Sequence, residues 1–215
     1  MWLNRRRKIQ QVPIFEHTKH ATDEYNNTGC ELRAFVDNFT SDKDTWHSYI
    51  GVYETLFEPI KSTATRVMEI GVSEGGSINM WSKYFSQAEI HGVDINLSRM
   101  LHTFTDPRIK LHSGDAYSTS FVDKFEPGSF DAIIDDGPHT LESMIQFVQL
   151  YPKLVKQDGL MIIEDVQSAD WIPQILKHLP KHLYQSTLVF DRRHLKGRYD
   201  DIQIVIRNTE NIVGI

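Results

Sequence analysis

The sequence has little of what anchors or cross-links a protein outside the cytoplasm. It contains a single cysteine, Cys30, which excludes an internal disulfide and a cluster of thiolate metal ligands. No apolar run reaches the ~18 residues of a membrane span. Met1-Trp2-Leu3 is followed by charged residues in place of the apolar core of a signal peptide. These absences predict a soluble, cytoplasmic protein with no membrane partner.

An excess of positive charge is also missing. The formal net charge is −6, which argues against a general nucleic-acid partner. No stretch rich in Pro, Gly or Ser divides the chain, and 215 residues suffice for one well-buried core. The sequence therefore predicts a single domain. Residues 1–65 form an irregular, partly helical cap or lid in this interpretation, and residues 66–215 form the core.

The core shows short apolar runs that alternate with helical patterns. This alternation predicts right-handed crossovers and a doubly wound, mainly parallel, seven-stranded Rossmann-like α/β sheet. The last two strands have no helix between them, so the last strand is expected to be antiparallel. The predicted strands are 66–71, 89–94, 109–113, 130–135, 159–165, 184–190 and 202–207, and the predicted helices are 77–85, 97–104, 119–125, 141–154 and 171–178.

Two neighbouring strands of this pattern end in acidic residues. The fourth predicted strand leads to Asp136 and, three residues later, His139. The fifth ends in Glu164 and Asp165. Because parallel strands bring their carboxyl ends to one rim, where open α/β sheets bind ligands, we expect these side chains to converge. An oxygen-rich pocket suits a hard divalent cation, and His139 would be free to act as a base.

The first predicted strand leads into a glycine-bearing turn and the start of a helix. Gly71 would let the backbone approach a ligand, and Ser77 could cap the helix. The glycine spacing does not match the dinucleotide fingerprint G-x-G-x-x-G. Glu69 would repel a pyrophosphate but attract an amino group. Asp94 and Asp115 end the next two strands, and Asp94 could accept hydrogen bonds from ribose hydroxyls. This pattern disfavours NAD and favours a ligand with a ribose and a cationic amino acid.

These motifs together resemble the class I S-adenosylmethionine-dependent methyltransferases, and among them the metal-dependent sugar O-methyltransferases of the macrocin and mycinamicin type. The resemblance covers roughly residues 41–207. It rests on Ser41-Asp42-Lys43 with His47 and Tyr49, Glu69-Ile70-Gly71, Gly75-Gly76-Ser77, Gly92-Val93-Asp94, Gly114-Asp115, Asp135-Asp136-Gly137-Pro138-His139 and Ile163-Glu164-Asp165.

The resemblance implies a role for each part of the rim. Asp136, Glu164 and Asp165 would bind Mg²⁺ or Mn²⁺, and His139 would be the general base. Contacts to S-adenosylmethionine would come from Glu69, Gly71, Ser77, Asp94, Asp115 and Asp135. The implied acceptor is a sugar hydroxyl of a glycan or a glycosylated small molecule. The long extra N-terminal domain of some members has no counterpart in this sequence, so the acceptor's identity and a homo-oligomer stay open.

Two other functions fit parts of the pattern. A catechol-like phenol could replace the sugar, since enzymes with such acceptors also place a metal at this rim. A non-catalytic binding or regulatory protein could share the cofactor fold. The intact set of carboxylates and histidine disfavours this second alternative, because a binding module has no need for a base beside a metal pocket.

Overall fold

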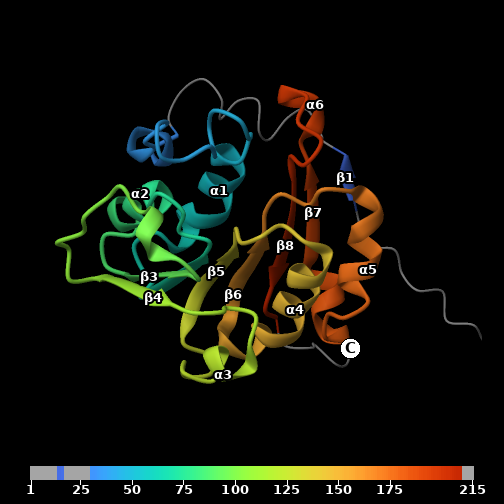
Figure 1. The fold of residues 1–215 in the computed structure, drawn as a ribbon. Coiled ribbons are helices and arrows are strands. Elements are labelled where there is room, and N and C mark those ends of the chain that lie inside the picture. Colours follow the sequence, from blue (N-terminus) through green and yellow to red (C-terminus); the bar gives the residue numbers. More distant parts are fainter. Residues whose placement is uncertain (1–13, 17–29, 210–215) are drawn as a thin grey trace, which may run out of the picture.

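The computed structural model describes residues 14–16 and 30–209, which form an eight-stranded sheet in the order β1-β7-β8-β6-β5-β2-β3-β4 (Figure 1). Strand β8 runs antiparallel to both of its neighbours, and every other pair is parallel. The strands are β1 (Ile14–Glu16), β2 (Arg66–Ile70), β3 (Glu89–Asp94), β4 (Ile109–Ser113), β5 (Phe130–Asp135), β6 (Val155–Ile163), β7 (Thr187–Asp191) and β8 (Ile202–Arg207). The mainly parallel, doubly wound sheet and its antiparallel last strand are confirmed.

Strand β1 is the element of the sheet that the sequence pattern does not reveal. The seven predicted strands are all present, and β1 adds an eighth at the edge, parallel to β7. A strand of three residues is too short to show a period-two pattern, so only its pairing identifies it. Residues 1–13 and 17–29 lie outside the described part of the chain, and the division into a cap of residues 1–65 and a core stays a prediction.

Most helices lie between the strands as the alternation predicts, but a helix of a single turn, α6 (Arg193–Lys196), lies between β7 and β8, where the sequence predicts no helix. The helices are α1 (Ile50–Phe57), α2 (Gly76–Tyr84), α3 (Thr119–Val122), α4 (Leu141–Leu150), α5 (Ile172–Leu176) and α6 (Arg193–Lys196). Within the described residues, none of these helices has the length and apolarity needed to cross a bilayer. Helix α4 begins at a capping box, in which the Thr140 side chain and the Ser143 backbone N–H pair.

The predicted helix 97–104 is wrong. Only a single 3-10 turn forms, Leu97–Arg99, after the Asn96 side chain accepts a hydrogen bond from the N–H of Ser98. Beyond it the N–H of Leu101 donates to the carbonyl of Glu74 at 3.0 Å. That bond ties the segment to the turn after β2, so the N–H is not available to continue the helix.

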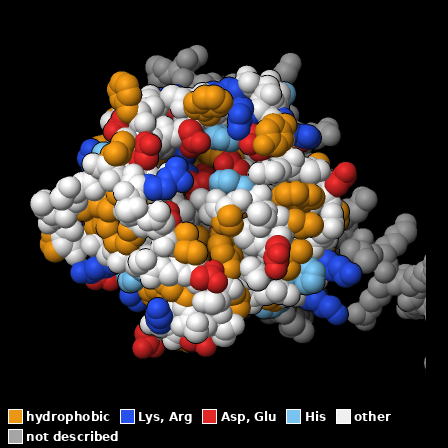
Figure 2. Space-filling model, in the orientation of Figure 1, with side chains coloured by type: hydrophobic (Ala, Val, Ile, Leu, Met, Phe, Trp, Pro, Cys, Tyr) orange, Lys and Arg blue, Asp and Glu red, His pale blue; other side chains and the backbone are white. Residues whose placement is uncertain are grey.

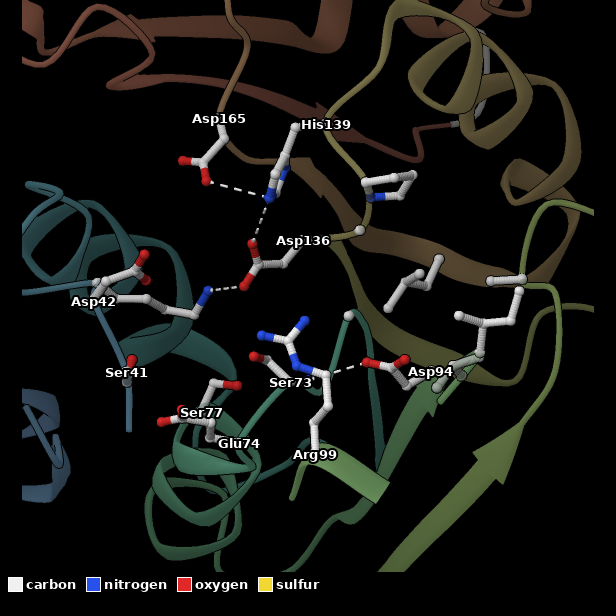
Figure 3. A pocket seen from close by; sticks show the side chains of 18 of the residues that line it. Ser41, Asp42, Ser73, Glu74, Ser77, Asp94, Arg99, Asp136, His139 and Asp165 are labelled. Atoms are coloured by element: carbon white, nitrogen blue, oxygen red, sulfur yellow. Dashed lines mark hydrogen bonds and ion pairs between the residues drawn. The ribbon is translucent and has the colours of Figure 1, made fainter. Parts of the chain in front are cut away.

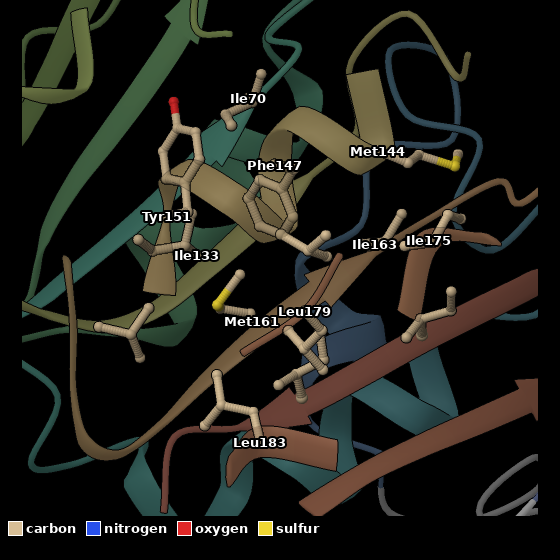
Figure 4. Close-up of a cluster of buried hydrophobic side chains, with 14 of the residues drawn as sticks. Ile70, Ile133, Met144, Phe147, Tyr151, Met161, Ile163, Ile175, Leu179 and Leu183 are labelled. Carbon is tan, nitrogen blue, oxygen red and sulfur yellow. The ribbon is translucent and has the colours of Figure 1, made fainter. Parts of the chain in front are cut away.

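Side chains of the central strands alternate between two hydrophobic cores. Ile133 and Met161 face the core that contains Phe147 of α4 and Ile175 of α5 (Figure 4). The next residue along each of these strands faces the other core, which contains side chains of α1 and α2. Because helices cover both faces of the sheet, a ligand can reach it only at the strand ends.

The strand order places such an opening between β2 and β5. From β2 the chain proceeds outward to β3 and β4, whereas from β5 it proceeds to β6 on the other side. A crevice at the carboxyl ends of the strands is expected at this reversal. Gly71 lets the two strand ends come together, because it has a φ of +91° and a Cβ there would lie 1.8 Å from the carbonyl oxygen of Asp136.

Candidate active site

A cavity of about 660 Å³ opens at the carboxyl ends of β2 to β6. Its size is that of a site for a small organic ligand. Figure 2 shows acidic and histidine side chains gathered in a hollow on this face, with hydrophobic and basic side chains around it. The predicted site residues that line the cavity are Gly71, Ser77, Asp94, Asp115, Asp136, His139 and Asp165.

Asp94 is held rigidly at one end of the cavity. One oxygen of its carboxylate accepts hydrogen bonds from the backbone N–H groups of Val72 at 3.0 Å and Ser73 at 3.1 Å. The other accepts from the N–H of Asn96 at 2.8 Å. The carboxylate therefore fixes the turn after β2 and still borders the cavity (Figure 3). This is the position that suits a ribose-binding acid.

Two of the predicted cofactor contacts, Glu69 and Asp135, lie behind the cavity wall. Ser77 Oγ donates to Glu69 at 2.5 Å, and the hydroxyl of Tyr117 donates to Asp135. Burial raises the pKa of each carboxyl to about 7. Ser77 and Tyr117 themselves line the cavity, so each of the two acids is hydrogen-bonded to a side chain that faces it. Their direct contact with a cofactor stays a prediction.

The other end of the cavity holds His139 between two carboxylates. Its Nε2 lies 3.5 Å from Asp165 Oδ2 and 3.8 Å from Asp136 Oδ1 (Figure 3). These three residues can each offer one ligand atom within 4.8 Å of the others. Both His139 and Asp165 adopt a left-handed backbone, with φ of +53°. Such conformations are uncommon for residues other than glycine, although Asp and His adopt them more readily than most, and they occur at functional sites.

Asp165 is further held from the N-terminal side of the site. The hydroxyl of Tyr49 donates to its Oδ1 at 2.5 Å, and His47 Nδ1 lies 3.3 Å from the same oxygen. Burial and the charge of Asp136 raise the pKa of Asp165 to about 6, while His47 and His139 act in the opposite direction. Tyr49 and His47 belong to the motif on which the resemblance rests, but their local sequence does not indicate which acid they contact.

A second group of acids lies deeper in the same rim. Glu69, Asp136 and Glu164 also bring ligand atoms within 4.8 Å of one another. The ammonium group of Lys43 lies among them, 2.6 Å from Asp136 Oδ2 and 3.3 Å from Glu69 Oε1, and it pairs with Glu164 Oε2. Tyr53 donates to the other Glu164 oxygen at 2.7 Å. The predicted metal ligands are thus divided between two groups that share Asp136.

The fold and this site are similar to those of methyltransferase domains. A family model described as "Methyltransferase domain" matches residues 68–166, the stretch from β2 to just beyond β6. The match includes the glycine turn, Asp94 and both acidic strand ends, and therefore most of the residues that line the cavity; residues 39–43 of the cavity wall lie outside it.

The relatives that the chain matches include sugar O-methyltransferases. The chain is 34% identical over 140 residues to the 8-demethyl-8-alpha-L-rhamnosyl tetracenomycin-C 2'-O-methyltransferase of Streptomyces olivaceus, covering 61% of this chain and 36% of that protein. It is 34% identical over 136 residues to the mycinamicin VI 2''-O-methyltransferase of Micromonospora griseorubida, covering 58% and 33%. The matches therefore span only about a third of each relative's length.

The fold is also similar to a solved structure. The MycE methyltransferase of the mycinamycin biosynthetic pathway, in complex with Mg and SAH, superposes with a TM-score of 0.64 at 25% identity. The match covers 86% of this chain and 55% of that one.

Proposed function

We propose that the chain is an S-adenosylmethionine-dependent O-methyltransferase that uses a divalent metal ion and acts on a sugar hydroxyl of a glycan or glycosylated small molecule. One observation carries this proposal: a single cavity, lined also by Gly71, has Asp94 at one end and Asp136, His139 and Asp165 at the other (Figure 3). A methyl donor and a hydroxyl acceptor could therefore meet inside it. The O-methyltransferase activities of the relatives, and the Mg and SAH in the similar structure, support the same assignment.

The residues at the rim fit a divalent cation. Carboxylate oxygens are the ligands that Mg²⁺ and Mn²⁺ prefer, and Asp136 and Asp165 present them to the cavity. Glu164 completes the set predicted from the sequence; it is bonded to Lys43 and Tyr53 in this structure. A bound ion would lower the pKa of the acceptor hydroxyl and orient it.

The chain's own residues can supply the remaining steps. Asp94 would accept hydrogen bonds from the ribose, and the glycine turn would allow the cofactor to approach the backbone. His139, as a neutral imidazole, would take the hydroxyl proton at Nε2 while the oxygen attacks the methyl carbon in line. The carboxylates of Asp136 and Asp165 on either side of the ring would stabilise the imidazolium that results. No covalent enzyme intermediate is needed.

The test is transfer of a labelled methyl group from S-adenosylmethionine to a panel of glycosides, sugar nucleotides and catechols in the presence of Mg²⁺. We expect label in a glycoside, loss of transfer after chelation and recovery with added Mg²⁺. Transfer to catechols alone would replace the sugar with a phenol. Full activity after exhaustive chelation would show that the carboxylates serve only structure. A cytoplasmic location and a homo-oligomer remain sequence-based predictions.

A further inference from the structure

Two large aromatic side chains are exposed close to the His139 end of the cavity. Trp46 is 63% exposed and Tyr199 is 59% exposed, and neither of them lines the cavity itself. Figure 2 shows hydrophobic side chains beside the acidic hollow on this face. Exposed apolar groups next to a pocket are typical of a surface that binds a ligand or a partner. The role of these two rings depends on where they lie relative to the rim.

Trp46 is tied to the rim by a single helical turn. The backbone N–H groups of Trp46 and His47 both donate to the carbonyl of Asp42 at 3.0 Å. Asp42 lines the cavity, and His47 Nδ1 lies 3.3 Å from Asp165 Oδ1. Residues four positions apart in such a turn lie on the same side, so Trp46 and Asp42 are neighbours at the edge of the cavity.

Tyr199 reaches the same edge from the loop between β7 and β8. The carbonyl of the next residue, Asp200, accepts a hydrogen bond from the hydroxyl of Tyr49 at 3.1 Å. The same hydroxyl donates to Asp165 at 2.5 Å. Trp46 and Tyr199 come from distant parts of the chain, and each is therefore one position away from a residue that is linked to Asp165.

Arg198 joins the two rings into one surface. Its guanidinium carbon lies 5.3 Å from the centroid of the Trp46 ring and 5.7 Å from the centroid of the Tyr199 ring, within the range of a cation–π contact. Its Nη2 donates to Asp200 Oδ2 at 2.9 Å, which fixes the guanidinium. Rings that are held before a ligand arrives lose less entropy on binding. Trp46, Arg198 and Tyr199 thus form an aromatic platform.

The charges around the aromatic platform disfavour an anionic ligand. Lys196 Nζ donates to the carbonyl of His47 at 2.6 Å, and Arg193 pairs with Asp191 at 2.6 Å. Arg198 is paired with a carboxylate as well. A phosphate group would have to break one of these contacts in order to use the cation, whereas a neutral ligand leaves all of them in place.

A neutral sugar ring has both properties that this surface can recognise. Its C–H faces are apolar and can stack on an aromatic ring, as aromatic side chains in ligand sites commonly allow. Its hydroxyl groups are hydrogen-bond donors. The side chain of Asp42 is 58% exposed beside Trp46 and offers carboxylate oxygens that can only accept. Apolar faces and acidic acceptors together therefore favour a sugar over a purely apolar group.

We propose that the aromatic platform is a second sugar subsite, where Trp46 and Tyr199 stack on the neutral pyranose next to the ring that is methylated. Asp42 would accept hydrogen bonds from the hydroxyl groups of this second ring, and Arg198 is a positioning residue for the two aromatic rings. The acceptor is then a neutral glycoside with at least two sugar rings and not a sugar nucleotide. The inference rests on the proposed function, because the methylated ring must lie at the His139 end of the cavity.

The number of sugar rings in the acceptor tests the proposal. The probes are the methyl glycosides of rhamnose and glucose, the neutral disaccharide methyl glycosides that end in each of these sugars, and UDP-glucose. Rhamnose is the sugar in the name of the tetracenomycin relative. With the wild type and Mg²⁺, we expect a KM for methyl transfer that is about 10-fold lower for a disaccharide than for its monosaccharide. UDP-glucose should be a poorer acceptor than either.

Substitutions in the aromatic platform should remove this preference. Trp46→Ala and Tyr199→Ala should each raise the disaccharide KM by about 10-fold, with kcat and the monosaccharide KM unchanged. Trp46→Phe, which keeps a ring face, should retain most of the preference. Leu101→Ala is the matched control, because it removes another exposed apolar side chain that does not line the cavity. Circular dichroism shows that each variant is folded.

Binding without turnover separates this proposal from the proposed function. Saturation-transfer NMR with the disaccharides, S-adenosylhomocysteine and Mg²⁺ should show contact with the second ring in the wild type and lose it in Trp46→Ala. Such contact without methyl transfer to any glycoside would reject the proposed function and leave the subsite supported.

Three results would overturn the subsite. They are equal KM values for monosaccharide and disaccharide in the wild type, a disaccharide KM that Trp46→Ala and Tyr199→Ala leave unchanged or that Leu101→Ala raises as much, and a preference for UDP-glucose. If no glycoside is methylated, absence of NMR contact with every disaccharide in the wild type overturns it too.

Discussion

At the scale of single residues, His139 is the general base of the proposed function. It borders the cavity, its Nε2 faces Asp136 and Asp165, and its left-handed backbone aims the ring between them. Asp135, the competing acid at the end of β5, is bonded to Tyr117 and lies behind the cavity wall. The geometry therefore favours His139 as the residue that takes the proton.

Replacing this imidazole should affect turnover far more than binding. We expect His139→Ala to lower the rate of methyl transfer by about 10²–10⁴-fold, the usual contribution of a general base, with little change in affinity for S-adenosylhomocysteine. Single-turnover transfer and calorimetry measure the two quantities. His178→Ala, which removes an exposed histidine bonded to Gln149, is the matched control. Near-normal turnover in His139→Ala would move the base elsewhere.

At the scale of elements, the turn after β2 depends on close approach as well as on conformation. Gly71 and Gly128 both have a positive φ, +91° and +61°, but only Gly71 has backbone within reach of a Cβ. Gly128→Ala should lower the free energy of unfolding by about 1–2 kcal/mol, because alanine disfavours the left-handed backbone. Alanine at Gly71 should cost about 2–5 kcal/mol, because overpacking against Asp136 adds to it. Urea unfolding of both variants measures the difference, and equal losses would exclude the steric contribution.

The strands β3 and β4 carry a histidine pair that should make stability depend on pH. His91 Nδ1 and His112 Nε2 are 3.0 Å apart, so one ring must donate and the other accept. Protonation of both rings would break this bond. Burial, Arg66 and His112 lower the pKa of His91 to about 4, whereas an unfolded histidine has a pKa of about 6.5. The unfolded chain therefore takes up a proton first as the pH falls.

The stabilisation from His91 is complete above pH ~6.5 and is lost between pH ~6.5 and ~4. We expect this part of the loss to amount to about 1–3 kcal/mol in the free energy of unfolding. Glu69 and Asp165, whose pKa values are raised to about 7 and about 6, act in the opposite sense. Comparison of His91→Gln with the wild type at pH 7 and 4.5 isolates the histidine. The same pH dependence in both proteins would contradict the assignment.

At the scale of the whole molecule, ligand binding should stabilise the fold as a unit, because the cavity joins the ends of five strands. A ligand whose free concentration is 100 times its dissociation constant raises the free energy of unfolding by about 2.7 kcal/mol. For a domain of this size that is a rise of about 5–10 °C in Tm. We expect this rise with S-adenosylhomocysteine, and no rise with NAD. A thermal shift with NAD alone would reject the cofactor assignment.

Much of this site can be predicted from the local sequence. An apolar run that ends in acid marks a buried strand and its carboxyl end, and parallel strands bring such ends together whatever the rest of the chain does. This is why strands β3, β4, β5 and β8 have their predicted bounds, and why the sequence alone predicts that Asp94, Asp136, His139 and Asp165 lie at the cavity. The failure at 97–104 has the opposite cause, since a bond to Glu74 there outweighs helix propensity.

Only the tertiary structure decided how the acids are divided. Lys43 is separated from Asp136 by 93 residues and from Glu164 by 121, and nothing near it in the sequence indicates that its ammonium group lies between them. The sequence by itself determined the fold class, the cavity edge and the residue types there, because these follow from periodicity and strand direction. The pairing of charges depends on which distant segments pack together, and that is a property of the folded chain.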